Sequence, residues 1–307
     1  MKTLQIGDGP LVASRLAFGC WRIADRSVAP ETGRRAILAA IESGCTLFDH
    51  ADIYCDGEAE KLFGRVLRES PDLRARLVIA TKCGIRKTGD PDAAAPYRYD
   101  LSAEYITRSC DNSLKRLGID TIDIYQLHRP DFLMDPAEVA QAFSTLRQAG
   151  KVREFGVSNF KPSQVIALQS ACPMRLQVHQ VEISMANLSA LEDGTLDQCL
   201  AERLTPMAWS PLAGGLLGDG PRRLLASQQA YRPAGVIGAI DSFAAAQGTS
   251  RTVVALAWLL RHPSHIIPII GSTDPDRIRE AAKADNLEIS REDWYRLLDA
   301  ARDKRLA

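Results

Sequence analysis

Short apolar runs alternate with longer amphipathic segments along almost the whole chain. Eight of these runs predict β-strands, because they are rich in Val, Ile, Leu or Phe and lack strict alternation with polar residues. That pattern is typical of parallel strands that are covered on both faces. The predicted strands span residues 15–19, 46–48, 77–80, 122–127, 154–157, 176–178, 206–209 and 266–270.

A segment with helical spacing of apolar positions follows each predicted strand. These segments span residues 31–43, 58–68, 103–117, 136–148, 162–170, 196–203, 251–261 and 275–283. Ser102 and Asp135 are placed to cap helix starts, and Gly44, Gly118 and Gly150 follow helix ends. Eight strand-then-helix units predict an α/β fold, a closed (β/α)8 TIM barrel, because parallel strands need right-handed crossovers that place the helices outside. We expect one domain over residues 1–307.

Four further segments lie outside the eight units. Residues 2–6 predict the first strand of an N-terminal β-hairpin that turns at residues 7–10. Residues 234–247 and 291–302 predict two extra helices. Residues 83–100, with Gly84, Gly89, Pro91 and Pro96, predict a long irregular loop that overhangs one end of the barrel and helps to shape a site.

Composition narrows the function classes. The 307 residues include 38 Lys+Arg and 38 Asp+Glu, so the formal net charge is zero and no basic excess favours nucleic acid or an anionic membrane. The polar first ten residues lack the apolar stretch of a secretory signal, and the longest apolar run, 253–260, is too short to span a bilayer. Seven cysteines without a C-x-x-C pair are typical of the reducing cytoplasm. No interface stripe stands out, so a monomer is the default expectation.

Candidate chemistry follows from the residues that end the strands, because the site of such a barrel lies at the carboxyl ends of its strands. Asp49 ends the second predicted strand and Tyr54 lies five residues further on. Lys82 follows the third strand and His128 the fourth. Each alone has an ordinary interpretation, as a helix cap, a packed aromatic residue, a solvated lysine or a core histidine. Successive strand ends bring all four together, which favours a shared function.

These four side chains can protonate the oxygen of a carbonyl group. A nearby ammonium group lowers the pKa of a tyrosine, ordinarily ~10, and a carboxylate paired with the lysine keeps the lysine charged. Lys82 and Asp49 are placed for these roles, and His128 can donate a hydrogen bond to the carbonyl oxygen. Since no side chain supplies the attacking group, we expect a bound hydride donor.

The remaining strand ends suit such a donor. Amide and hydroxyl groups for a carboxamide come from Ser158, Asn159 and Gln180, and the indole of Trp209 can stack on a flat ring. Gly271, Ser272 and Thr273 lead into a helix whose first turn contains Arg277, a combination that suits a phosphate. The same residues are also typical of an ordinary helix start.

Four ordered motifs give the chain a family resemblance. They are Phe48–Tyr54 (FDHADIY), Ala80–Gly84 (ATKCG), Tyr125–Pro130 (YQLHRP) and Gly156–Phe160 (GVSNF). In register over nearly the whole chain, they resemble the signatures of the aldo-keto reductase family, and the form of the first motif is most similar to its bacterial YdhF-like branch. The resemblance implies a (β/α)8 barrel that binds NADP(H), needs no metal and reduces a small aldehyde or ketone.

The resemblance also implies roles by position. Tyr54 matches the general acid, Lys82 and Asp49 the residues that tune it, and His128 the residue that orients the carbonyl. Further cofactor contacts are implied at Gly19, Cys20, Trp21, Asp49, Ser158, Asn159, Gln180, Trp209, Ser210, Pro211, Leu212, Gly214, Gly271, Ser272, Thr273, Arg277 and Glu280. Ser272 and Arg277 match the 2′-phosphate site, and Arg277 favours NADPH over NADH. Trp21, Tyr54, Ile85, His128 and Arg129 are expected to face the substrate.

Three departures limit the resemblance. Trp209 stands where many members place a tyrosine, although an indole can still stack. Ala281 stands where many carry an adenine-reading asparagine, which leaves Glu280 as the nearest candidate. The chain stops about five residues after the last predicted helix, so we expect no long C-terminal loop over the pocket and transfer no substrate.

Two other classes of function compete with carbonyl reduction. A metal-dependent barrel hydrolase could draw ligands from His50, His128, His179, Asp49 and Asp52, but the chain has no H-x-H or H-E-x-x-H spacing and Lys82 would oppose a cation. A nicotinamide-bound redox sensor with little turnover would keep the same cofactor contacts. The complete set of four polar residues favours the reductase.

Overall fold

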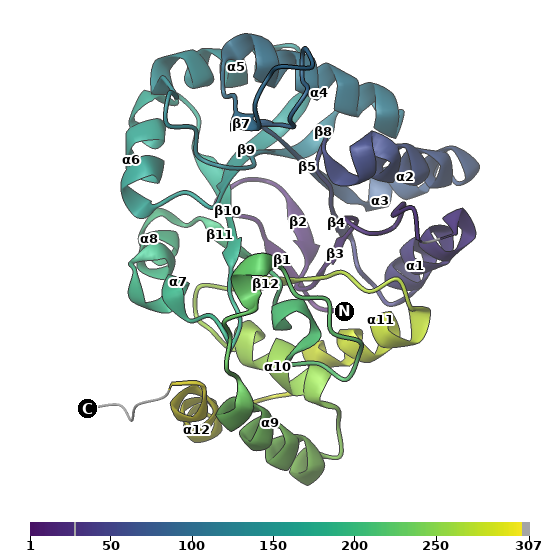
Figure 1. Cartoon of the computed structure of the whole chain (residues 1–307), viewed down its shortest axis with the longest axis vertical. Helices are drawn as coiled ribbons and strands as arrows, with labels where there is room; N and C mark the ends of the chain where they lie inside the picture. Colours follow the sequence, from purple (N-terminus) through teal and green to yellow (C-terminus); the bar gives the residue numbers. More distant parts are fainter. Residues whose placement is uncertain (28, 303–307) are drawn as a thin grey trace.

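The computed structural model describes residues 1–27 and 29–302. Its centre is a closed barrel of eight parallel strands, in which each strand pairs with the next along the chain and the last pairs with the first (Figure 1). This arrangement confirms the predicted (β/α)8 fold. The barrel strands are β3 (Ala17–Gly19), β4 (Leu47–Asp49), β5 (Val78–Cys83), β8 (Ile122–Leu127), β9 (Val152–Ser158), β10 (Leu176–Glu182), β11 (Thr205–Trp209) and β12 (Ile267–Ile270).

Helices surround the barrel (Figure 1). The α-helices are α1 (Pro30–Glu42), α2 (Glu58–Glu69), α3 (Leu73–Arg76), α4 (Ala103–Leu117), α5 (Pro136–Gln148), α6 (Pro162–Ala171), α7 (Ser189–Glu192), α8 (Thr195–Glu202), α9 (Ala234–Gln247), α10 (Arg251–Leu260), α11 (Pro275–Ala282) and α12 (Arg291–Ala301). Short 3₁₀ helices are η1 (Tyr54–Gly57), η2 (Ala213–Gly215), η3 (Ala226–Gln228) and η4 (Lys283–Asn286). Ser102 and Asp135 cap α4 and α5 through their side chains, as predicted. In the described part of the chain, no helix is both long enough and apolar enough to cross a bilayer.

An apolar layer fills the barrel at the amino ends of its strands. Inward-facing side chains such as Leu47, Ile124 and Val178 form one buried cluster there. The predicted hairpin is present as β1 (Thr3–Gln5) and β2 (Val12–Ser14), and it closes this end of the barrel with Ile6 and Leu11. Burial of these apolar side chains stabilises the barrel from within, far from the strand ends that hold the polar residues.

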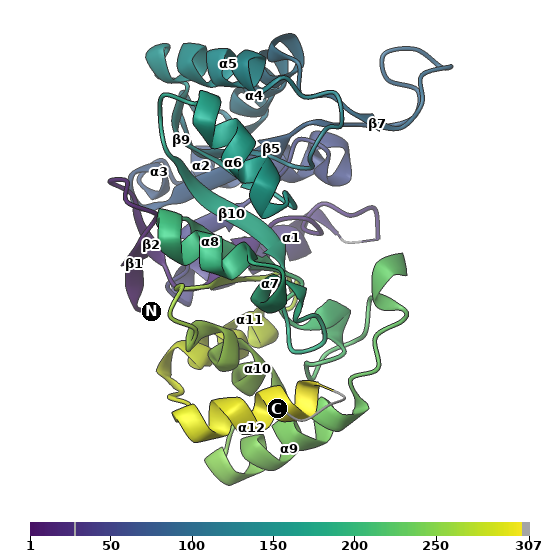
Figure 2. The same ribbon diagram turned by 90° about the vertical axis from the view of Figure 1, so that its left-hand side faces the viewer.

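The turn of the hairpin requires glycine at residue 7. Gly7 has a φ of +59°, and a Cβ atom there would lie 2.0 Å from the Gln177 side-chain oxygen. Its backbone N–H donates to Thr205 Oγ1 at 2.7 Å, which ties the turn to β11. Figure 2 shows the hairpin at one side of the molecule, opposite the β6–β7 segment described below.

Toward the carboxyl ends of the strands, the inward-facing positions become polar. Two residues further along five of the strands, the barrel places Asp49, Lys82, Gln126, Ser158 and Gln180, all buried. Strands β4, β5 and β10 continue through these residues to Asp49, Cys83 and Glu182, beyond their predicted ends. The predicted strands were too short because a polar inward residue interrupts the apolar run while backbone pairing continues.

The two extra helices pack against each other and against α10, as Figures 1 and 2 show at the lower end of the molecule. The Trp258 and Trp294 rings stack with centroids 4.8 Å apart and planes 3° apart. Each indole N–H also donates to the backbone oxygen of the other tryptophan, at 3.1 and 3.0 Å. This contact fixes α12 on the outside of the barrel.

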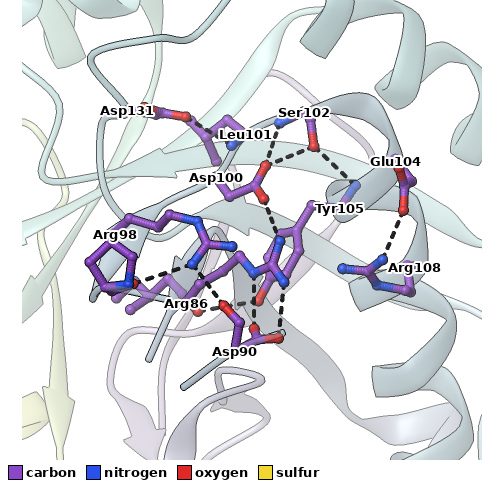
Figure 3. Close-up of polar contacts among 12 residues, drawn as sticks. Arg86, Asp90, Arg98, Asp100, Leu101, Ser102, Glu104, Tyr105, Arg108 and Asp131 are labelled. Carbon is purple, nitrogen blue, oxygen red and sulfur yellow. Dashed lines mark hydrogen bonds and ion pairs between the residues drawn. The ribbon is translucent and has the colours of Figure 1, made fainter. Parts of the chain in front are cut away.

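The expectation of an irregular loop over residues 83–100 is wrong in part. Strands β6 (Ile85–Arg86) and β7 (Arg98–Tyr99) pair as a short antiparallel hairpin. The Arg86 guanidinium holds both sides together, because it bonds both oxygens of Asp90 and also Asp100, all at 2.9 Å (Figure 3). Charged side chains rather than apolar periodicity order the segment, so the hydrophobic pattern contains no signal for it.

Candidate active site

A buried ion pair lies at the centre of the polar layer. Lys82 is fully buried, and its Nζ lies 2.7 and 2.8 Å from the two carboxylate oxygens of Asp49. Its third hydrogen bond goes to the backbone oxygen of His50, at 2.6 Å. Burial acts to lower the pKa of Lys82, but Asp49 and Tyr54 together outweigh burial and hold the pKa above its ordinary value. The ammonium group therefore stays charged, as predicted.

Gln180 completes this group from the opposite side of the barrel. Its Nε2 donates to Asp49 Oδ1 at 2.8 Å. The sequence placed Gln180 against a nicotinamide carboxamide and contained no sign of this contact, since the two residues are 131 positions apart. The amide has a second polar atom, Oε1, so one side chain can support Asp49 and still accept a hydrogen bond from a ligand.

Tyr54 begins η1, directly after the turn that follows β4. Lys82 Nζ lies 5.1 Å from the centroid of its ring. η1 is irregular, since Cys55 and Asp56 within it both have left-handed backbone conformations, with φ of 50° and 57°. The Tyr54 ring also lies 6.5 Å from that of Trp21 and 5.9 Å from that of His128, between centroids.

The pKa of Tyr54 differs from the expectation. Burial raises the pKa of its hydroxyl to about 12, and the charge of Lys82 acts in the predicted direction but does not outweigh burial. The expected net lowering is therefore wrong for the protein without ligand, because removal of water disfavours the phenolate more than the ammonium group stabilises it. Tyr54 is a neutral phenol with a proton to give.

His128 lies at the mouth of the barrel as a neutral imidazole. Burial lowers its pKa well below the ordinary value, and the charges of Lys82 and Arg129 add to this effect. Its Nδ1 is buried and has no hydrogen-bond partner among the described residues, so the single proton is best placed on Nε2. A neutral imidazole with Nε2–H can donate a hydrogen bond.

Asn159 links the ends of β8, β9 and β11. It follows β9 with a left-handed backbone, φ 62°. Its Nδ2 donates to Ser158 Oγ at 2.8 Å and to the backbone oxygen of His128 at 3.1 Å. Its Oδ1 accepts a hydrogen bond from Trp209 Nε1 at 2.9 Å. The structure thus brings together the predicted hydroxyl, amide and indole, and it fixes the indole by a contact that the sequence did not indicate.

The segment that follows β11 folds back on itself beside the mouth. Ser210, Ala213 and Gly214 have left-handed φ values of 48°, 48° and 64°. A Cβ atom at Gly214 would lie 2.8 Å from the Arg223 backbone oxygen, so close packing of the segment requires glycine there. Leu212 is half-buried and Pro211 is buried. The predicted pyrophosphate contacts thus lie in one turn with an unusual backbone.

Gln228, which the sequence did not single out, anchors this segment. It is fully buried, and its Nε2 donates to Glu182 Oε1 at 2.7 Å while its Oε1 accepts the Leu225 N–H at 3.0 Å. Asp219 provides a second anchor, because it accepts hydrogen bonds from the backbone and hydroxyl of Thr252 at 2.9 and 2.7 Å. In the sequence, this segment was indicated only by polar residues that follow neither helical nor strand periodicity.

The residues that were predicted to bind a phosphate lie at the start of α11. Gly271 is exposed, Ser272 and Thr273 are half-buried, and Asp274 caps the helix. The Arg277 side chain is 47% exposed and lies 3.7 Å from Asp274. A Cβ atom at Gly220 would lie 3.0 Å from Arg277 Nη1, so the segment after β11 passes over this arginine.

Five other predicted site residues lie at different depths in the structure. Gly19 packs closely on β12, since a Cβ atom would lie 2.8 Å from Ile269. The Cys20 side chain lies in the core, which leaves only its backbone for a ligand. Trp21 is 43% exposed beside Tyr54, whereas Ile85 is buried. Glu280 bonds Lys283 at 2.6 Å, and this hydrogen bond keeps the pKa of Glu280 below its ordinary value.

A second buried polar cluster lies behind the site and was not predicted. Glu60 accepts hydrogen bonds from Thr81 at 2.7 Å and from Arg116 at 2.6 Å. Nearby, Asp52 accepts a hydrogen bond from Ser109 at 2.7 Å. A signal existed in the sequence, because Glu60 lies on the apolar face of α2, where a charged residue needs a buried partner.

The side chains that were considered as metal ligands do not form a metal site. His50 lies edge-on to Phe63, and His179 is buried elsewhere, on β10. Within residues 1–27 and 29–302, no three His, Cys, Asp or Glu side chains are placed so that they could share a metal ion.

The fold and the site define the class, a (β/α)8-barrel oxidoreductase. Residues 15–302 match the Aldo/keto reductase family. The chain is 43% identical over 308 residues to a 6-dehydroglucose reductase of Novosphingobium aromaticivorans, with 98% of this chain and 96% of the relative covered. It is 40% identical to the oxidoreductase YdhF of Escherichia coli, with 94% and 93% covered.

A solved structure agrees with these sequence matches. The glycerol dehydrogenase AKR11B4 from Gluconobacter oxydans superposes with a TM-score of 0.85 at 26% identity, covering 97% of this chain and 94% of that one. The chain belongs to the aldo/keto reductase family, and its similarity to YdhF confirms the predicted branch. Members of this family use nicotinamide cofactors.

Proposed function

We propose that the protein is an NADPH-dependent carbonyl reductase in which Tyr54 is the general acid. The observation that carries the proposal is the arrangement of a neutral phenol beside a charged Lys82 that is fixed by Asp49. A general acid must hold its proton until the carbonyl oxygen gains charge, and a pKa of about 12 ensures that Tyr54 does so.

Lys82 acts on Tyr54 after the proton leaves. Its N–H groups are bound by Asp49 and the His50 backbone, and it favours the phenolate form of Tyr54 mainly through its charge and to a smaller extent through a side-chain hydrogen bond. An ammonium group in a site with little water stabilises the phenolate that forms, which lowers the energy of the transition state. Asp49 and Gln180 keep the ammonium group charged and in place.

His128 orients the substrate. Its Nε2–H can donate to a carbonyl oxygen that also meets the Tyr54 hydroxyl, because the centroids of the two rings lie 5.9 Å apart. A neutral donor is suited to this role, since it does not compete with Tyr54 for the proton. The carbonyl oxygen is thus bound by two donors, only one of which gives up its proton.

The residues present fit a nicotinamide cofactor. Ser158 Oγ, the Asn159 amide and Gln180 Oε1 offer donors and acceptors for a carboxamide, and the half-buried Trp209 ring is held by Asn159 for stacking. Arg277 and Ser272 supply cationic and hydroxyl donors for a phosphate. When bound, the reduced cofactor supplies the hydride that the protein itself lacks.

The names of the relatives suggest a substrate. Proteins that are 43% and 38% identical over nearly their whole length are both 6-dehydroglucose reductases, the second from Agrobacterium fabrum. We therefore propose a small aldehyde of the sugar type, with 6-dehydroglucose the first compound to test.

The test is an assay of NADPH oxidation with 6-dehydroglucose and a panel of simple aldehydes and ketones. We expect multiple turnovers with at least one carbonyl and formation of the corresponding alcohol. A protein that binds NADPH and releases it unoxidised with every compound would instead be a sensor, and the proposal would fail.

A further inference from the structure

Arg129 lies at the mouth of the barrel without a role in the proposed chemistry. It directly follows His128 at the end of β8 and is half-buried. Its guanidinium carbon lies 5.9 Å from the centroid of the Trp209 ring. The aromatic face supports one side of the guanidinium plane, so its N–H groups point outward from the edges of that plane.

This arginine lacks the carboxylate partners that the buried Arg86 and the partly buried Arg116 have. Arg86 is bonded by two carboxylates, as Figure 3 shows, and the partly buried Arg116 is bonded by Glu60. No hydrogen bond or ion pair joins the Arg129 guanidinium to any residue that the structure describes. A half-buried cation without a counter-ion is costly, and such groups are typical of binding sites.

The charged neighbours of Arg129 leave it uncompensated. The Asp49 carboxylate already bonds Lys82 and Gln180, and His128 is neutral. Tyr97, on the β6–β7 segment, is close enough that the Arg129 charge opposes the rise that burial causes in the pKa of its hydroxyl. The Trp209 ring lies beside the guanidinium and no described carboxylate bonds it, so its N–H donors are available to a ligand.

We propose that Arg129 is a specificity-determining residue that binds acceptor oxygens carried by the substrate away from its reacting carbonyl. This inference rests on the proposed function, because it assumes that the carbonyl lies between Tyr54 and His128. Arg129 directly follows His128, so its guanidinium group can reach the substrate atoms next to the carbonyl. Hydroxyl groups and a carboxylate share the required chemistry, and both present acceptor lone pairs to a planar fork of donors.

The experiment compares three aldehydes with four carbons. Butanal carries no second acceptor, 3,4-dihydroxybutanal carries hydroxyls, and 4-oxobutanoate carries a carboxylate. For the parent enzyme, we expect kcat/KM for at least one oxygen-bearing aldehyde to exceed that for butanal by about tenfold or more, the value of one charge-assisted hydrogen bond. Arg129→Met should remove this advantage, so that kcat/KM for the oxygen-bearing aldehyde divided by kcat/KM for butanal falls close to one.

Arg129→Lys distinguishes the two sources of acceptors. It retains the charge but not the planar fork, so it should keep part of the preference for 4-oxobutanoate and lose most of a preference for the dihydroxy compound. Arg296→Met, at a side chain that is 75% exposed on α12, is the matched control and should change none of these ratios.

The inference is overturned if the parent shows no preference for either oxygen-bearing aldehyde, or if Arg129→Met lowers kcat/KM for all three aldehydes equally. Failure of the proposed function looks different, because then none of the aldehydes, nor any other carbonyl of the panel, would be reduced. Loss of folding is not expected, since Arg129 makes no hydrogen bond to the part of the chain that is described.

Discussion

Gln180 and Asp49 share a hydrogen bond across the barrel, from Nε2 to Oδ1 at 2.8 Å. The same carboxylate oxygen lies 2.7 Å from Lys82 Nζ. Asp49 is therefore held by a cation on β5 and by a neutral amide on β10, so Gln180 supports the carboxylate that positions the ammonium group. This relationship makes the position of Lys82 a property of the closed barrel rather than of one pair.

The first prediction concerns this amide. Gln180→Met preserves volume but removes the donor, which leaves part of a buried carboxylate unsatisfied. We expect the free energy of unfolding to fall by about 1–3 kcal/mol, the usual cost of such a loss. Urea denaturation measures the change, with Gln141→Met on the exposed face of α5 as the control. Equal stability of the two variants would contradict the proposed support of Asp49.

The second prediction concerns the general acid. Tyr54→Phe removes the hydroxyl and keeps the ring, so kcat should fall by about 10²–10⁴-fold, the usual contribution of a general acid. The affinity for NADPH should stay within about twofold, because the proposed cofactor contacts lie on other residues. Steady-state kinetics and fluorescence titration measure the two quantities. A variant that reduces carbonyls at the rate of the parent would remove Tyr54 from the mechanism.

Much of the fold was predictable because it depends on local patterns. Apolar runs and helical periodicity located all eight barrel strands and the helices that follow them, and topology then required Asp49, Lys82 and His128 to converge. Contacts between distant side chains were not predictable in this way. The Trp209–Asn159 and Gln180–Asp49 hydrogen bonds depend on rotamers, and the β6–β7 hairpin depends on Arg86 and two carboxylates.

The direction of the pKa shift of Tyr54 also could not be predicted from the sequence. The residue types correctly indicated that Lys82 favours the phenolate. The direction in which the pKa of Tyr54 finally shifts depends on how much water the fold removes from its hydroxyl. Burial is a property of the assembled barrel, so the two opposing effects could be compared only in the structure.

The third prediction concerns Asp52 and pH. Burial is the main cause that raises the pKa of this carboxyl from 3.8 to about 7, so the folded state favours its protonated form. Protonated Asp52 therefore stabilises the folded state. This stabilisation is complete below the ordinary pKa of 3.8, is lost as the pH rises toward 7, and stays lost at higher pH. Asp52→Asn avoids the charge and can still accept the Ser109 hydrogen bond.

We therefore expect Asp52→Asn to match the parent at about pH 4 and to be more stable by about 1–3 kcal/mol at about pH 8. Urea denaturation at several pH values measures this difference. Asp111→Asn, at a half-exposed carboxylate on α4, serves as the control and should show no such trend. A stability difference that does not change with pH would show that folding does not raise the pKa of Asp52.

The fourth prediction concerns the choice of cofactor. Arg277 is 47% exposed at the start of α11, beside Asp274 and under the segment that contains Gly220, and we propose that it binds the 2′-phosphate. Arg277→Ala should weaken NADPH binding by about tenfold or more, the value of one charge-assisted contact, and NADH binding by less than about twofold. Arg279→Ala is the matched control, because that arginine lies on the same helix, is 52% exposed and pairs with Asp276 and Glu42 instead. It should change neither affinity. Titration of NADPH and NADH against the parent and both variants measures the ratio of the two affinities. Equal weakening of NADPH and NADH binding by Arg277→Ala would show that this arginine does not bind the 2′-phosphate.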